Sequence, residues 1–170
     1  RSFKVVAGDC NETLGGVLDE LRSADLRWAP TFAFIDPYTS STLLWETLRR
    51  LADFKRDKKY KIELWFLFFG SNIPRVLGQR TTSNAEQVTR TFGCEDWVPI
   101  AEARDEGRID AAQARYEYTN LIRWRLEREL GYRSTHTLEI KNTSGAYLYD
   151  LIFATDNAAG DKIMRDVYGK

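Results

Sequence analysis

Three apolar segments, each followed by a segment with helical spacing, constrain the fold of this chain more than any other feature. They are residues 3–7, 31–35 and 62–69. The second and third are apolar almost throughout, as is typical of strands that are covered on both faces of a parallel sheet. Three consecutive strand–helix steps predict an α/β fold with parallel strands and right-handed crossovers.

The C-terminal part has a different period. Residues 135–141 and 147–153 alternate between apolar and polar side chains, and Asn142-Thr143-Ser144-Gly145 lies between them. This pattern predicts an antiparallel hairpin. A last helix is expected at residues 158–167.

Helices are predicted from apolar spacing and capping residues. Asn11 is expected to cap a helix over residues 11–21, and Thr39-Ser40-Ser41 to cap the next. Short helices are expected at 73–77 and 85–91, and a polar loop at 94–107.

The longest helix is expected at residues 110–130. Arg123–Glu127 and Arg125–Glu129 are predicted as i,i+4 pairs on its exposed sides. A basic face toward a phosphate backbone is an alternative for its arginines, but the interleaved glutamates favour an ordinary solvated face. Its predicted apolar seam comprises Tyr118, Ile122, Leu126 and Leu130.

Length and composition limit the class of protein. A chain of 170 residues predicts one domain over residues 1–170. Lys and Arg together number 25, and Asp and Glu together also number 25, so the formal net charge is zero. The zero net charge therefore disfavours a strongly cationic nucleic-acid clamp for the chain as a whole, although it leaves a local basic face open. No apolar run approaches the roughly 20 residues of a membrane span.

The two cysteines predict neither a disulfide framework nor a structural zinc site. Cys10 and Cys94 lie far apart and neither belongs to a CxxC motif, which speaks against disulfide bonding and a structural zinc site. Reduced cysteines and an N-terminus unlike a signal peptide predict a cytoplasmic location.

Asp36, Pro37 and Tyr38 are the candidate catalytic residues. They follow an apolar strand, and ligands of open α/β sheets bind at the C-terminal ends of strands. A carboxylate there can orient or deprotonate an acceptor, and the neighbouring aromatic ring can stack on a planar substrate. The competing interpretation is a strand-to-helix turn with a solvated Asp36.

Gly8, Asp9, Cys10 and Asn11 are the candidate cofactor-binding residues. They follow the first expected strand, and Asp9 could accept a hydrogen bond from an adenine amino group. The alternative is an Asx turn that starts a helix. A carboxylate after the second strand, on the same side, favours the binding interpretation.

Other catalytic arrangements find little support. His136 is the only histidine and falls in the expected hairpin, so it is interpreted as structural. A Ser-His-Asp triad and a histidine metal site are disfavoured. The sequence contains no GxxxxGK phosphate loop.

The order of elements resembles the second half of a class I S-adenosylmethionine-dependent methyltransferase. That family has a Rossmann-like sheet of seven strands, of which the last two form an antiparallel pair at one edge. The resemblance implies that the expected strands are the third to seventh, and that the first two, with the glycine-rich cofactor loop, are missing. In this family the missing strands separate the third from the fourth. We therefore expect an N-terminally truncated fragment, or a partner chain that completes the sheet.

Several segments together resemble the three-Cys-motif partner protein family, TcmP. The resemblance implies a methyltransferase-like fold, S-adenosylmethionine as cofactor, contact of Asp9 with its adenine, and a methyl-transfer site lined by Asp36-Pro37-Tyr38. It also implies a three-Cys-motif protein as a partner. The segments are residues 5–12, 31–38, 62–69, 72–75, 147–155 and 160–164.

Three functions are weighed. The first is a methyltransferase whose acceptor is unknown, with nucleic acid, protein and small molecules all open. The second is an inactive methyltransferase-like scaffold that serves a three-Cys-motif protein, such as a radical or Fe–S protein. The third is an unrelated α/β domain with a nucleotide or nuclease role, which a divalent metal bound by Asp9 and Asp36 would support.

Overall fold

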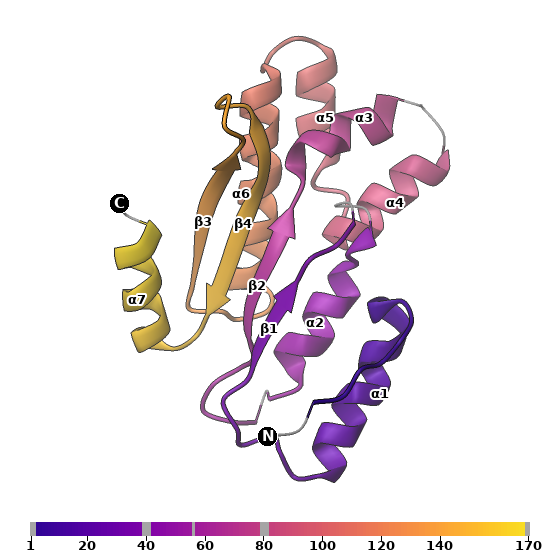
Figure 1. Cartoon of the computed structure of the whole chain (residues 1–170). Coiled ribbons are helices and arrows are strands. Elements are labelled where there is room, and N and C mark those ends of the chain that lie inside the picture. The colour runs from indigo at the N-terminus through magenta and orange to yellow at the C-terminus, as the bar shows by residue number, and fades with distance from the viewer. Residues whose placement is uncertain (1–2, 39–41, 56, 79–81, 169–170) are drawn as a thin grey trace.

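The computed structural model describes residues 3–38, 42–55, 57–78 and 82–168 (Figure 1). The chain forms four strands within these ranges: β1 (Phe32–Ile35), β2 (Glu63–Phe68), β3 (Ser134–Lys141) and β4 (Tyr147–Thr155). A short 3-10 turn, η2 (Gly70–Asn72), follows β2. The helices are α1 (Cys10–Ser23), α2 (Trp45–Asp53), α3 (Ile73–Gly78), α4 (Thr82–Phe92), α5 (Val98–Asp105), α6 (Ala111–Arg128) and α7 (Ala158–Tyr168).

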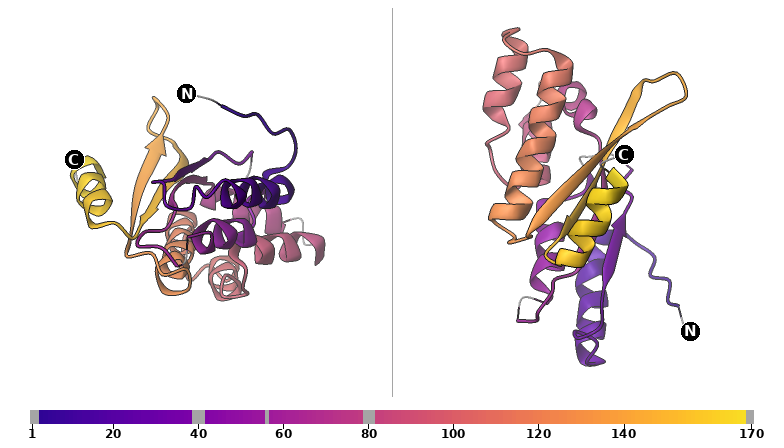
Figure 2. Two further views of the ribbon diagram at one scale, coloured as in Figure 1. Left: turned by 90° about the horizontal axis from the view of Figure 1, so that it is seen from below. Right: turned by 90° about the vertical axis from the view of Figure 1, so that its left-hand side faces the viewer.

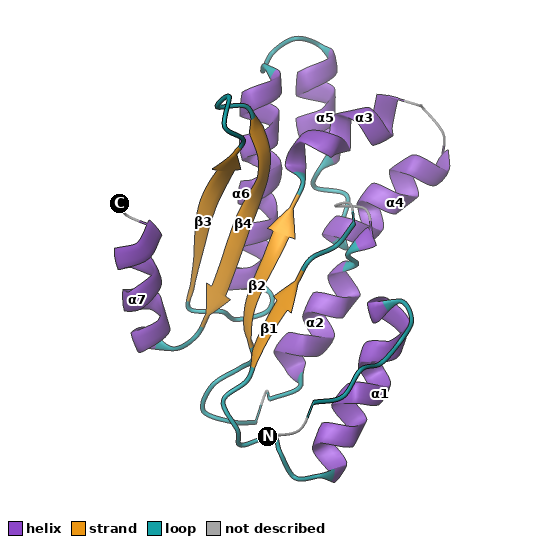
Figure 3. Ribbon diagram, viewed as in Figure 1, coloured by secondary structure: helices purple, strands orange, loops and turns teal. Residues whose placement is uncertain are grey.

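The strands form one mixed sheet in the order β1-β2-β4-β3 (Figure 3). β1 pairs with β2 in parallel, through Phe32 opposite Glu63 and Ile35 opposite Phe66. β4 runs antiparallel to β2, and β3 antiparallel to β4. The α/β class and the C-terminal hairpin are therefore confirmed. β4 comes last in sequence among the four described strands, yet it lies between β2 and β3.

The strand predicted at residues 3–7 is wrong. Residues 3–9 have no regular structure, and Phe3, Val5 and Val6 are exposed. A strand needs a neighbour to accept its backbone hydrogen bonds. No described strand pairs with this segment, so its apolar side chains remain in solvent. The sheet of the described residues has four strands where five were expected.

One face of the sheet carries the hydrophobic core. Leu64, Phe66 and Ile152 point to this face and are fully buried. Helices α1, α2 and α6 lie on this side (Figure 2). The seam predicted for α6 is confirmed, because its four members all belong to the core: Tyr118, Ile122, Leu126 and Leu130.

The opposite face is covered only in part. Asp161 of α7 contacts His136 of β3, so α7 lies over the β3–β4 side. On the β1 side, Phe32 is 49% and Phe34 57% exposed. Their rings meet Trp65 of β2 edge to face, at centroid distances of 5.8 and 6.0 Å. The prediction that this strand is covered on both faces is therefore wrong for the described residues.

Two helical expectations also change. Residues 94–107, expected as a loop, contain α5. Pro99 lies in the first turn of this helix, where its missing N–H costs no intrahelical bond. The expected caps Thr39, Ser40 and Ser41 lie outside the described residues, and α2 begins after Leu44 without a side-chain cap.

The two ion pairs predicted on α6 have different outcomes. Arg125 does pair with Glu129, at 2.5 Å, but Arg125 is buried rather than exposed. Arg123 instead donates to Thr135 Oγ1 at 3.0 Å, and Glu127 accepts from the same threonine. Arg123 and Glu127, which the helical spacing predicted to pair with each other, therefore both hydrogen-bond to Thr135 of β3 instead.

Candidate functional site

Asp9 begins α1. Its Oδ1 accepts hydrogen bonds from the backbone N and the Nδ2 of Asn11, at 2.8 and 2.9 Å. The N-cap is therefore Asp9, and the prediction that Asn11 caps this helix is wrong. Gly8 has φ +133°, and a Cβ there would lie 2.8 Å from Thr13 Cγ2. Only glycine adopts this conformation readily, so Gly8 sets the direction in which Asp9 enters the helix.

Asn11 joins α1 to the start of α2. Its Nδ2 donates to the carbonyl of Thr42 at 2.8 Å, and its Oδ1 accepts from Thr47 Oγ1 at 2.6 Å and from the backbone N of Leu44 at 3.3 Å. The segment of residues 8–11 is thus fixed against the loop that follows β1.

Asp36, Pro37 and Tyr38 follow directly after β1. The start of α1, the end of β1 and the start of α2 lie at the same end of the sheet (Figure 1). The two predicted groups, residues 8–11 and 36–38, therefore lie at the same end of the sheet, where β1 ends. Asp36 and Tyr38 are both exposed.

Two carboxylates at this end of the sheet have unused oxygen atoms. Among the residues that the structure describes, Asp9 Oδ2 accepts no hydrogen bond and the Asp36 carboxylate has no hydrogen-bond or ion-pair partner. Both groups lie open to solvent. They are therefore able to accept hydrogen bonds from a ligand without breaking an existing contact.

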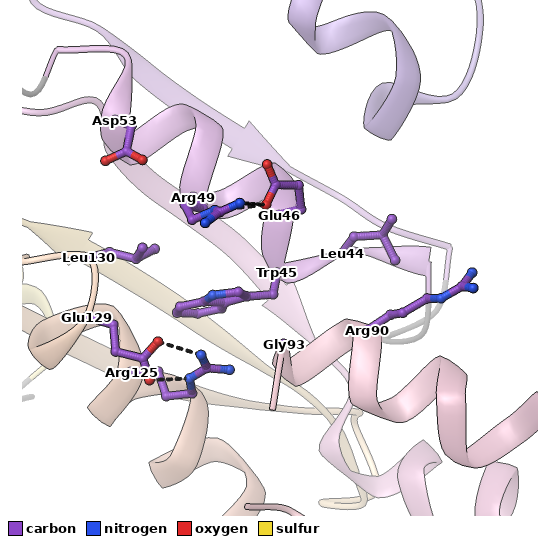
Figure 4. Close-up of a pocket in the computed structure, with 10 residues that line it drawn as sticks. All are labelled: Leu44, Trp45, Glu46, Arg49, Asp53, Arg90, Gly93, Arg125, Glu129 and Leu130. Carbon is purple, nitrogen blue, oxygen red and sulfur yellow. Dashed lines mark hydrogen bonds and ion pairs between the residues drawn. The ribbon is translucent and has the colours of Figure 1, made fainter. Parts of the chain in front are cut away.

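A polar cavity of about 610 Å³ lies beside this edge, between α2, α4 and α6 (Figure 4). The guanidinium of Arg125 lies against the Trp45 ring, 4.3 Å from its centroid. It also donates to both oxygens of Glu129 and to the carbonyl of Phe92. The lining residues are Leu44, Trp45, Glu46, Arg49, Asp53, Arg90, Gly93, Arg125, Glu129 and Leu130.

The charges of this cavity largely neutralise one another. Arg49 pairs with Glu46 at 2.5 Å, and Arg125 with Glu129. Burial raises the pKa of the nearby Cys94 thiol, against the opposing effects of the Asp96 backbone and Arg125. The arrangement holds α2, α4 and α6 together. Sequence spacing alone had placed Arg125 on the solvated side of α6.

His136 contacts Asp161 in a structural cluster. His136 Nε2 and Ser134 Oγ both lie within hydrogen-bond distance of Asp161 Oδ1, at 2.8 and 2.7 Å. Arg165 pairs with the other oxygen of this carboxylate at 2.6 Å. Serine and histidine meet the same carboxylate oxygen, which is not the serine–histidine–aspartate order of a catalytic triad. The structural interpretation of His136 is therefore supported.

Comparisons with known proteins give no match: no family model matches the chain, and neither do any curated protein or solved structure. Within the described ranges, no group of three or more His, Cys, Asp and Glu side chains is placed to hold a metal ion. No helix of the described chain has the length and apolarity to cross a membrane. The arrangement of residues therefore carries the functional argument.

Proposed function

We propose that this chain is the C-terminal half of a class I S-adenosylmethionine-dependent methyltransferase domain of the TcmP type. Further polypeptide, either N-terminal sequence or a partner chain, completes its sheet and cofactor site. The proposal includes a three-Cys-motif protein as a partner and leaves the methyl acceptor open, with nucleic acid among the candidates.

The observation that carries the proposal is the open side of β1. Among the described strands only β2 pairs with β1, so the outer edge of β1 offers free backbone groups. This strand contains no charge and no proline, the usual protections of an edge. A further strand fits this edge, and the antiparallel β3–β4 pair lies at the other edge, as the resemblance implies.

Apolar side chains beside this edge support the same conclusion. Phe32 and Phe34 are exposed on the face that α7 leaves open. A Cβ at Gly160 would lie 2.5 Å from Glu63 Oε1, so this side of α7 faces β2. Ile163 and Val167 follow at i+3 and i+7 and are exposed as well. Exposed apolar side chains beside an unpaired strand are typical of a surface that another segment covers.

The unused carboxylates define the roles of the site residues. S-adenosylmethionine supplies an electrophilic methyl group when it is bound. Asp9 Oδ2 would accept a hydrogen bond from the adenine amino group of this cofactor, and the backbone of Cys10 and Asn11 would lie beside it, while Gly8 positions Asp9. Asp36 orients the acceptor or takes its proton, with Pro37 fixing the turn and Tyr38 presenting an aromatic face. Positioning of the acceptor then contributes much of the rate.

Calorimetric titration with S-adenosylhomocysteine tests the cofactor site. It is carried out on this chain and on the full-length product of the gene that encodes it, with any partner that co-purifies. We expect binding by the completed form. Asp9→Ser keeps a helix cap but shortens the side chain, so affinity should fall at least about tenfold. Asp19→Ala, an exposed change on the same helix, is the matched control.

The outcomes separate the functions. Binding that is lost with Asp9→Ser and kept with Asp19→Ala supports the cofactor site. If no form binds S-adenosylhomocysteine, the methyltransferase proposal fails and the chain is a scaffold for its partner. If Asp9→Ser binds like the wild type, the assignment of Asp9 is wrong.

The open side of β1 can be tested without the cofactor. The fluorescent dye ANS binds exposed apolar surface, so it should bind this chain and bind Phe32→Ser/Phe34→Ser less strongly. In the completed form the same double substitution should leave dye binding unchanged, because the phenylalanines are then covered. If the chain alone and the completed form bind the same amount of dye, nothing covers β1 in the completed form.

A further inference from the structure

A cavity of about 420 Å³ lies at the opposite end of the strands from Asp36. It is formed by the loops that lead into β1 and β2, at the lower end of these strands in Figure 1, together with Asn157 before α7. Its volume falls within the range of about 300–1,000 Å³ that is common for small-molecule sites. It belongs neither to the predicted cofactor residues nor to the predicted catalytic residues.

Positive charge is concentrated in this cavity. Five cationic side chains line it, and Glu63 is the only carboxylate among the described residues of its lining. Nearby Asp57 pairs with Arg27 and lies 4.0 Å from Lys58, while Asp156 accepts from the backbone N of Lys61. Five cations thus face three carboxylates, in a chain whose net charge is zero. The cations are Arg27, Lys55, Lys58, Lys59 and Lys61.

Two of these lysines have no acidic partner. Within the described residues, the ammonium groups of Lys59 and Lys61 lie within ion-pair distance of no carboxylate. Lys59 Nζ lies instead 5.1 Å from the centroid of the Tyr60 ring. An anion could therefore bind both lysines without displacing an existing ion pair.

Lys55 adds a buried charge. It is only 3% exposed although it lines the cavity. Its Nζ donates to the carbonyl of Ala29, and an ammonium has two further donors. Burial lowers the pKa of Lys55, while Asp156 acts in the opposite direction. A buried ammonium with unused donors is costly unless an anion or water completes its hydrogen bonds.

Two aromatic side chains line the same cavity. Trp28 is 71% and Tyr60 39% exposed. Both side chains are therefore accessible to solvent next to the lysines, and the Lys59 ammonium lies over one face of the Tyr60 ring. Positive charge that follows a backbone, together with aromatic rings on which bases stack, is the combination used by proteins that bind single-stranded nucleic acid.

We propose that this cavity binds a segment of single-stranded nucleic acid, with a base stacked on Trp28 or Tyr60 and phosphates bound by Lys59, Lys61 and Lys55. The site is separate from the proposed methyl-transfer edge, so its ligand binds without the cofactor. Stacking favours an unpaired strand, because the base faces of a duplex are already stacked on one another. The sequence contains this signal as the basic and aromatic segment Lys58-Lys59-Tyr60-Lys61.

Fluorescence anisotropy with a 5′-labelled single-stranded 12-mer of uridylate tests the proposal on the chain as given. We expect binding that weakens as salt increases. Trp28→Ala should reduce affinity roughly tenfold through the loss of base stacking. Lys59→Ala/Lys61→Ala should reduce the slope of log K against log salt by about 1.4, since each phosphate contact to a single strand contributes about 0.7.

Matched controls make the result specific. Trp124→Ala removes an exposed tryptophan of α6, and Lys141→Ala/Lys162→Ala removes two exposed lysines elsewhere. Both should leave binding unchanged, and all four variants concern exposed or half-buried residues, so folding is expected to be retained.

Three results would overturn the proposal. The first is absence of oligonucleotide binding at low salt. The second is equal weakening by the control variants. The third is binding of polyphosphate, or of vesicles containing phosphatidylserine, as tightly as the 12-mer with no effect of Trp28→Ala, which would make the cavity a general anion site.

Discussion

A methyl group on Gly93 would overlap the indole ring of Trp45. Gly93 ends α4 with φ +68°, and Trp45 begins α2. The absence of a side chain on Gly93 therefore lets the end of one helix approach the start of another.

Gly93→Ala should destabilise the chain by about 3 kcal/mol, because it adds overpacking to the cost of a left-handed backbone. Gly107→Ala is the control, since Gly107 also has positive φ, at +72°, but a Cβ there would meet nothing within 4 Å. It should cost only about 1 kcal/mol. Urea unfolding measures both values. Equal losses would show that the contact with Trp45 contributes nothing.

Arg125→Met should reduce the free energy of unfolding by about 2–3 kcal/mol. The substitution removes the stacking on Trp45 and leaves the carbonyl of Phe92 without this donor. Arg125→Lys should restore little, because lysine lacks the planar fork that binds Glu129. Arg128→Met, on the exposed side of the same helix, should be close to neutral in the same urea titrations.

Asp161 should make the attachment of α7 sensitive to acid. Hydrogen bonds from Ser134 and His136 hold the pKa of Asp161 below its ordinary value, with Arg165 acting in the same direction. A carboxylate with a lowered folded-state pKa stabilises the fold above its unfolded pKa, about 3.9, and loses this contribution as pH falls through the folded value.

Unfolding by urea between pH 6 and pH 2.5 tests this expectation. Asp161→Asn should be less stable than the wild type at pH 6, and the difference should shrink toward pH 2.5. Asp166→Asn, an exposed change on α7, should follow the wild type throughout. A constant difference between Asp161→Asn and wild type would contradict the role of its charge.

Asp150 should show the opposite sign. This carboxyl group is buried and accepts from Thr119 Oγ1 at 2.6 Å and from the Tyr147 hydroxyl at 3.2 Å. Burial raises its pKa, although these hydrogen bonds and Arg115 act in the opposite direction. The folded state therefore takes up its proton at higher pH than the unfolded state, so protonation adds stability as pH falls between the two pKa values.

Asp150→Asn should therefore be within about 1 kcal/mol of the wild type at pH 7, or more stable, because it keeps acceptors without the buried charge. The stability of Asp150→Asn relative to the wild type should decrease as the pH is lowered, because the wild-type carboxyl group then becomes protonated. Asp150→Ala should cost about 1–3 kcal/mol at pH 7, since the Thr119 and Tyr147 hydroxyls lose this acceptor. They keep only the carbonyls of Arg115 and Phe68, at 3.1 and 3.4 Å. Thermal unfolding of the three proteins measures the differences.

Local patterns predicted the elements whose partners are near in sequence. The α6 seam at Tyr118 and Ile122 and the hairpin around Asn142 follow from periods of 3.6 and 2 residues. Residues 3–7 have the same apolar pattern as a strand, but pattern does not supply a neighbouring strand. Pro99 offered a signal for α5 that the polar composition of residues 94–107 obscured.

The position of the candidate residues in the fold was predictable, but their contacts were not. The sequence placed Asp9 and Asp36 after consecutive apolar segments, and the structure brings both to one edge. The hydrogen bonds of Asn11 to Thr42 and Thr47 span more than 30 residues, and no local spacing encodes them. The burial of Arg125 and Lys55 likewise depends on helices and loops that meet only in the folded chain.

The attachment of α1 has a consequence for how this protein would report a ligand. Leu18 is the only residue of α1 that is buried, and Asn11 supplies the polar contacts to the start of α2. A helix with so little buried surface opens locally more often than the core does. Its amide hydrogens should therefore exchange with solvent early, and a molecule bound at Asp9 would slow that exchange along the whole helix while β2 and α6 stayed unchanged.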